Sequence, residues 1–140
     1  MKKYELTEET KVIGGKTLFR IRALRSFGGI KAGDLGGFIE NERNLSHGGN
    51  AWVGGNARVG GDGLINSNND YLCEQGLGSR NRSASFFKCK DGHIHVLCGC
   101  FSGNLDEFEN KVKEEHGNSK YSKEYLGFIE VVKTHFEVRQ

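Results

Sequence analysis

The four cysteines are the residues of this sequence with the most specific chemistry. Zinc prefers thiolate and imidazole ligands, and four such ligands form a tetrahedral site. The closest pair, Cys98 and Cys100, is separated by one residue, whereas zinc fingers place at least two residues between paired cysteines. Two interpretations therefore remain open, namely ordinary buried thiols and a zinc site. The predicted zinc ligands are Cys73, Cys98, Cys100 and His135.

A nucleophilic cysteine is not expected. The dipeptide Asp91-Gly92 predicts a two-residue hairpin turn between strands at 83–90 and 93–101. In that register the histidines of the second strand point away from Cys89, so no thiol–imidazole pair forms. Cys89 and Cys98 would lie about 13 Å apart at ~3.3 Å per residue, too far to share an ion. We therefore expect that the chain is not an enzyme.

Basic residues could form a second kind of site. The glycine-rich loop at 75–82 carries two arginines, whose guanidinium groups could hold a phosphate or a carboxylate together with backbone N–H groups. The loop lacks the Gly-Lys-Ser/Thr sequence of a P-loop. A basic patch over loop and hairpin could bind nucleic acid or an acidic protein; the alternative is a scattered, solvated face. The predicted contact residues are Arg80, Arg82, Lys88, Lys90, His93 and His95.

Two helices are expected after the hairpin. The first is predicted at 105–116, because Asn104 and Glu107 are placed to form a capping box and Gly117 is a typical helix stop. The second is predicted at 120–137, where apolar residues recur at helical spacing. Because the connection between them is short, we expect the helices to pack antiparallel.

The segment at 49–66 consists of three six-residue units. Val53, Val59 and Ile65 recur six residues apart, and each unit begins with a Gly-Asn or Gly-Asp pair that suits a turn. This period is typical of a left-handed parallel β-helix, of which three units make about one coil. Because one coil cannot bury its own interior, we expect strands at 1–43 to cap it.

The expected fold class is therefore α+β. Short N-terminal β-strands and about one coil of left-handed β-helix are followed by a small unit with a β-hairpin and two helices. The expected domains are 1–69 and 70–140. The 140 residues carry a net charge of +2, which argues against an acidic DNA mimic and is too small to identify a nucleic-acid binder. The sequence has neither a signal peptide nor a long apolar run, so we expect a cytoplasmic protein that does not contact a membrane.

Several segments carry a family resemblance. They are Lys3-Tyr4-Glu5-Leu6-Thr7, Gly33-Asp34-Leu35-Gly36-Gly37-Phe38-Ile39-Glu40, the Gly-Asn-Ala hexads, Gly78-Ser79-Arg80-Asn81 and Cys98-Gly99-Cys100-Phe101. They resemble the left-handed β-helix proteins found in phages and prophages, and a small α+β domain that is often appended to those proteins. Proteins of this family usually have several coils, whereas this chain has hexads for about one.

The resemblance implies a setting in a phage or another mobile element. Small proteins of that setting often inhibit host defence, and anti-CRISPR proteins are among them. We therefore expect a non-enzymatic inhibitor that binds a host defence protein or nuclease complex, such as a CRISPR effector, in the cytoplasm of the host bacterial cell. The alternatives are a nucleic-acid-binding module and a virion assembly protein. The oligomeric state is not predicted.

Overall fold

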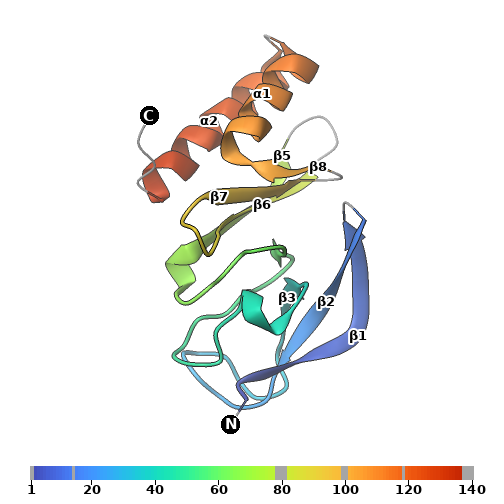
Figure 1. Ribbon diagram of the computed structural model, residues 1–140, viewed down its shortest axis with the longest axis vertical. Coiled ribbons are helices and arrows are strands. Elements are labelled where there is room, and N and C mark those ends of the chain that lie inside the picture. The colour runs from blue at the N-terminus through green and yellow to red at the C-terminus, as the bar shows by residue number, and fades with distance from the viewer. Residues whose placement is uncertain (1, 14, 78–81, 99–100, 118, 137–140) are drawn as a thin grey trace.

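The computed structural model describes residues 2–136 except 14, 78–81, 99–100 and 118. It contains two four-stranded sheets and two α-helices, so the predicted α+β class is confirmed at that level. Figure 1 shows three layers: the N-terminal sheet and its loops, the second sheet in the middle, and the helix pair on the far side. Among the described residues, neither helix combines the length and the apolar character that a membrane span requires.

The first sheet has the order β1-β2-β3-β4. Its strands are β1 (Tyr4–Ile13), β2 (Lys16–Ala23), β3 (Leu35–Ile39) and β4 (Arg58–Val59). The first three strands are antiparallel neighbours, and β4 runs parallel to β3. Gly15, with φ of 79°, lies in the tight turn between β1 and β2, where a left-handed backbone suits glycine. A short 3-10 helix, η1 (Glu42–Asn44), follows β3.

The hexad segment does not form a coil of left-handed β-helix, so that prediction is wrong. Within 49–66, all of which is described, β4 is the one strand, and Ile65 adds an isolated parallel bridge to Leu45. Turns at Gly55 and Gly61, both with φ of 55°, interrupt the rest. A coil needs paired strands on three faces and neighbouring coils to stack on, which three units alone cannot supply. The six-residue spacing does mark fully buried positions, namely Val53, Val59 and Ile65.

The second sheet is antiparallel throughout and has the order β5-β6-β7-β8. It follows a second 3-10 helix, η2 (Asn68–Asp70), so the predicted domain boundary after residue 69 falls inside η2. The strands are β5 (Tyr71–Leu77), β6 (Arg82–Lys88), β7 (Ile94–Cys98) and β8 (Phe101–Asn104). The predicted hairpin is therefore present as β6 and β7, although its register differs from the prediction.

Both predicted helices are present, as α1 (Leu105–His116) and α2 (Lys120–His135). The capping box of α1 is formed: the Asn104 side chain accepts a hydrogen bond from the Glu107 N–H at 2.8 Å, and Glu107 Oε1 accepts one from the Asn104 N–H at 2.9 Å. Gly117, with φ of 55°, ends α1. The predicted end of the second helix at residue 137 lies outside the described residues.

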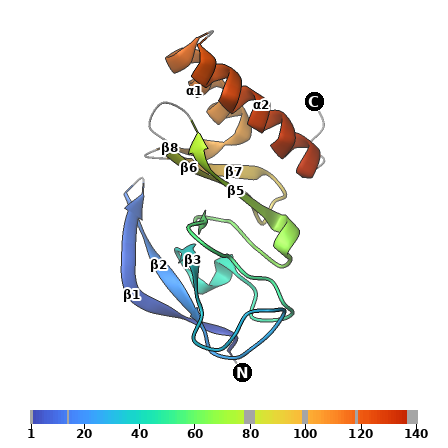
Figure 2. The same ribbon diagram turned by 180° about the vertical axis from the view of Figure 1, so that it is seen from behind.

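The second sheet is buried on both faces. Phe86 and Val96 belong to the apolar cluster beneath α1 and α2, whereas Phe87 and Leu97 belong to the cluster of the N-terminal layer. Alternate residues of β6 and β7 therefore serve two different cores. Figure 2 shows the same sandwich from behind, with the second sheet between the helices and the N-terminal strands.

Candidate metal centre

The turn between β6 and β7 has three residues rather than the predicted two. The Gly92 N–H donates to the Cys89 carbonyl at 2.9 Å, and the Cys89 N–H donates to the His93 carbonyl at 2.9 Å. Gly92 has φ of 92°, a left-handed backbone angle that glycine adopts readily. Asp91 Oδ1 accepts from the His93 N–H at 3.0 Å, which further fixes the turn. The loop therefore consists of residues 90–92.

This turn shifts the hairpin register by one residue. Phe87 pairs with His95 and Lys88 with Ile94, whereas a two-residue turn would pair Lys88 with His95. A shift of one residue moves a side chain to the other face of a sheet. Cys89 and His95 consequently lie on the same face as Phe87, which is the face that packs against the N-terminal layer.

Cys89, His93 and His95 come together on this face. One ligand atom from each side chain lies within 4.8 Å of the others. Zinc–sulfur bonds of about 2.3 Å and zinc–nitrogen bonds of about 2.0 Å place tetrahedral ligand atoms roughly 3.3–3.6 Å apart, so only a small adjustment of the side chains is needed. The three residues could therefore hold a metal ion.

Hydrogen bonds orient both imidazole rings. His93 Nδ1 bonds the Asp91 carboxylate, which leaves Nε2 for a ligand interaction. His95 Nε2 lies 2.9 Å from the Ser102 hydroxyl on β8, which leaves Nδ1. Metal-binding histidines usually have such a partner on their other nitrogen, because it fixes the tautomer and the ring orientation. The cluster thus has supporting contacts as well as ligand atoms.

The Cys89 thiol is neutral at pH 7 as long as no cation lies beside it. Burial raises its pKa to about 12, and the carboxylates of Asp91 and Asp62 add to this effect. Burial also lowers the pKa of His95, with a smaller contribution from His93, so this imidazole is held in the neutral form that can bind a metal. A bound cation would favour the Cys89 thiolate, so metal binding would release a proton.

The predicted zinc ligands are not brought together among the described residues. Cys73 on β5 packs against the N-terminal cluster, whereas Cys98 on β7 belongs to the helix-side cluster, so β6 separates them and they lie on opposite faces. His135 Nε2 contacts the Asn69 carbonyl at 2.9 Å. Cys100 lies outside the described residues.

The predicted basic patch is described only in part. Arg80 and the side chain of Arg82 lie outside the described part of the chain. Lys88, Lys90 and His93 are exposed at the end of the hairpin, and they lie close together in sequence around the turn. His95, the last predicted contact residue, is half-buried in the metal cluster.

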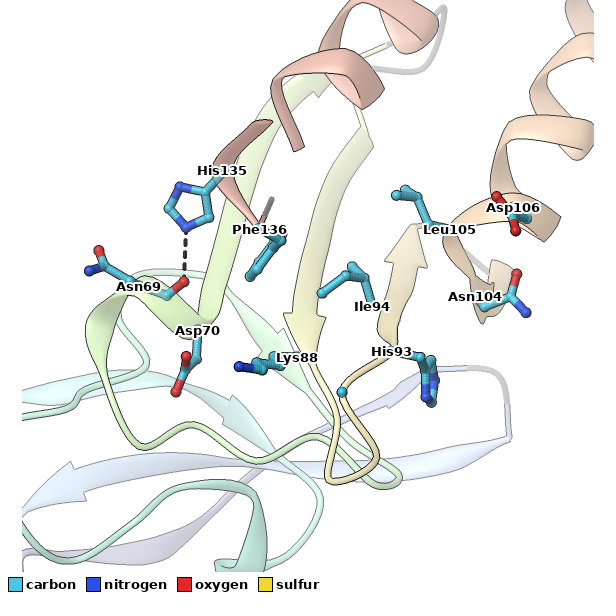
Figure 3. A pocket seen from close by; sticks show the side chains of 11 residues that line it. Asn69, Asp70, Lys88, His93, Ile94, Asn104, Leu105, Asp106, His135 and Phe136 are labelled. Carbon is cyan, nitrogen blue, oxygen red and sulfur yellow. Dashed lines mark hydrogen bonds between the residues drawn. The ribbon is translucent and has the colours of Figure 1, made fainter. Parts of the chain in front are cut away.

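A pocket of about 500 Å³ lies on the helix side of the same hairpin. Figure 3 shows Lys88 and Ile94 from the hairpin, Leu105 at the start of α1 and Phe136 after α2 around it. The contact between His135 and the Asn69 carbonyl closes one side. Four segments that are distant in sequence form this pocket, so no local sequence signal could have revealed it.

No family model and no curated protein sequence matches the chain. The kinship with phage β-helix proteins therefore stays a prediction, and the proposals below rest on geometry and chemistry.

Proposed function

We propose that this chain is a zinc-binding protein whose site is formed by Cys89, His93 and His95. The proximity of their ligand atoms, within 4.8 Å, is the observation that supports this proposal. One thiolate and two imidazoles form a sulfur–nitrogen set that favours zinc over magnesium or calcium, which prefer oxygen ligands. Asp91 and Ser102 would hold the two rings in place.

The ion would cross-link the two sides of the hairpin turn, which itself contacts the N-terminal layer. Cys89 forms an isolated bridge with Gly63, and the Lys90 N–H donates to the Asp62 carbonyl at 2.9 Å. A metal bound by Cys89, His93 and His95 would fix the geometry of the turn that makes these contacts. Because the three ligands come together only in the folded chain, zinc binding would stabilise the fold.

The test is the zinc stoichiometry of the purified protein and of two cysteine variants, measured by elemental analysis. We expect one zinc per chain in the wild type and in Cys98→Ser, and loss of zinc in Cys89→Ser. Cys98 is the matched control because its thiol is equally buried but lies on the opposite face. Absence of zinc from the wild type would refute the proposal. Loss of zinc in Cys98→Ser but not in Cys89→Ser would instead support the ligand set predicted from sequence.

A second function has support from the exposed cations at the same turn. Lys88 and Lys90 flank Cys89 and are both exposed, an arrangement that suits contact with phosphate groups. If the hairpin binds nucleic acid, the affinity should fall steeply with salt, and the salt slope should be shallower in a Lys88→Ala/Lys90→Ala variant. Fluorescence anisotropy with labelled DNA and RNA measures both. Binding that is absent or insensitive to salt would exclude this function.

Inhibition of a bacterial defence nuclease and a role in virion assembly stay predictions, and so does the lack of enzymatic activity. Direct mixing with a CRISPR effector tests inhibition, since an inhibitor should form a stable complex and reduce target cleavage. Light scattering tests assembly, because a monomer in solution would count against that role.

A further inference from the structure

We infer that the metal ion held by Cys89, His93 and His95 keeps one coordination position for a small monodentate anion that exchanges with water. This inference rests on the proposed zinc site. It adds to the three protein ligands the class of external ligand that would bind the ion.

The ligand count leaves a position open. Zinc in proteins is usually four-coordinate; structural sites have four protein ligands, whereas sites with three protein ligands complete the shell with solvent or substrate. Among the described residues, the group has three members, and no carboxylate oxygen joins them within the same 4.8 Å limit. The fourth ligand would therefore come from solution.

The polar neighbours of the cluster support the rings instead of completing the shell. The Asp91 carboxylate accepts hydrogen bonds from the backbone N–H and the ring of His93. The Ser102 hydroxyl bonds His95. Each oxygen thus engages one ring nitrogen and leaves the other nitrogen of that ring for the ion, which is the arrangement of an outer hydrogen-bonding partner.

Access and charge favour a small anion. Cys89 is only 4% exposed, whereas the His93 side chain is 39% exposed, so solvent reaches the cluster from the His93 side. Zinc with one thiolate and two neutral imidazoles has a net charge of about +1. The Lys16 ammonium adds positive potential at His95, and the carboxylates of Glu107 and Asp62 oppose it. The ion itself is the nearest of these charges, so it dominates the attraction.

Cobalt substitution with azide as the probe tests the inference. Co²⁺ replaces Zn²⁺ with similar ligands and reports its coordination through visible d–d bands and a sulfur-to-cobalt charge-transfer band. We expect azide to shift the d–d bands with saturation at one azide per cobalt, while the charge-transfer band persists. Cys98→Ser should behave like the wild type, and Cys89→Ser should lose the charge-transfer band.

The outcomes separate this inference from the proposed function. If the cobalt protein shows the charge-transfer band but azide leaves its d–d bands unchanged, the site has no open position. That result would contradict this inference and leave the zinc proposal unaffected. A protein that binds no cobalt or zinc would overturn both. Because azide binding is read from the wild-type spectrum, the result does not depend on a variant that might fail to fold.

Discussion

Lys3 is a buried lysine whose ammonium group contacts backbone carbonyls. Its side chain is fully buried, with Nζ at 2.5 Å from the Ala51 carbonyl and 3.3 Å from the Gly48 carbonyl. The ammonium also lies 5.0 Å from the centre of the Phe27 ring. Burial lowers the pKa of Lys3, with a smaller contribution from Arg25, whereas the two carbonyls and the ring interact favourably with its charged form. Lys3 therefore links the start of β1 to Gly48 and to Ala51 in the first hexad.

Replacement of Lys3 by methionine should destabilise the protein. Lys3→Met preserves length and apolar contact but leaves two carbonyls without their donor, so we expect a loss of about 2 kcal/mol in the free energy of unfolding. Urea unfolding followed by Trp52 fluorescence measures the loss. The neighbouring Lys2→Met is the control, because Lys2 makes an exposed ion pair with Glu42 that should contribute little. Equal stability of the two variants would contradict this account of Lys3.

Glycine at position 63 lies where no side chain fits. A Cβ there would meet Val59 Cγ1 at 2.6 Å and Phe87 Cδ2 at 2.7 Å, so Gly63→Ala should cost about 1–3 kcal/mol through overpacking. Gly127 lies inside α2 with open space around its Cα, so Gly127→Ala should stabilise by about 0.5–1 kcal/mol. The thermal unfolding midpoint should thus fall for Gly63→Ala and rise for Gly127→Ala; an unchanged or raised midpoint for Gly63→Ala would argue against the close approach of Phe87.

At the scale of the elements, an ion-pair network ties α1 to α2. Glu109 on α1 contacts Lys113 on the same helix and Lys133 on α2, each at 3.0 Å. Hydrogen bonds from Lys113 and then Lys133 hold the pKa of Glu109 below its usual 4.5. Since the pKa is lowered in the folded state, this network stabilises the fold above pH 4.5 and the contribution is lost as the pH falls through the lowered value.

The network predicts a pH-dependent effect of Glu109→Gln. At pH 7 the variant should be less stable than the wild type by up to about 1 kcal/mol, and the difference should shrink as the pH falls below 4.5. Urea unfolding at a series of pH values measures it. Glu114→Gln changes an exposed carboxylate of the same helix and should show little pH-dependent difference. A Glu109→Gln effect that is constant with pH would rule out the electrostatic explanation.

At the scale of the molecule, the middle sheet couples two cores. Neighbouring residues Phe86 and Phe87 are both fully buried, one under the helices and one against the N-terminal layer. Loss of either core would expose one face of β6 and β7. The regions at 1–69 and 70–140 are therefore expected to unfold together, in contrast to domains with independent cores.

This coupling predicts a single unfolding transition. Trp52, the one tryptophan of the chain, reports on the N-terminal layer, whereas far-UV circular dichroism at the helix band reports on α1 and α2. The two unfolding curves should coincide. Phe87→Ala should lower the free energy of unfolding by about 3–5 kcal/mol, and by the same amount with either probe. Val131→Ala, an exposed residue of α2, should shift neither. Separate midpoints for the two probes would mean that the regions unfold independently.

The sequence by itself determined the elements whose signals are local. The capping pair Asn104 and Glu107, the stop at Gly117 and the helical spacing of apolar residues located both helices, because caps and amphipathic periods act within a few residues. The six-residue spacing of Val53, Val59 and Ile65 identified buried positions. This spacing did not determine which strands the segment between these residues would pair with, since strand pairing depends on residues that are distant in sequence.

Tertiary structure decided the hairpin register and therefore the candidate site. Because β6 and β7 are buried on both faces, Phe86 and Phe87 are equally apolar, and the hydrophobic pattern cannot distinguish two registers one residue apart. The three-residue turn and the two packed layers make that choice. It brings Cys89 to the face of His95, a pairing that the two-residue turn predicted from Asp91-Gly92 had excluded.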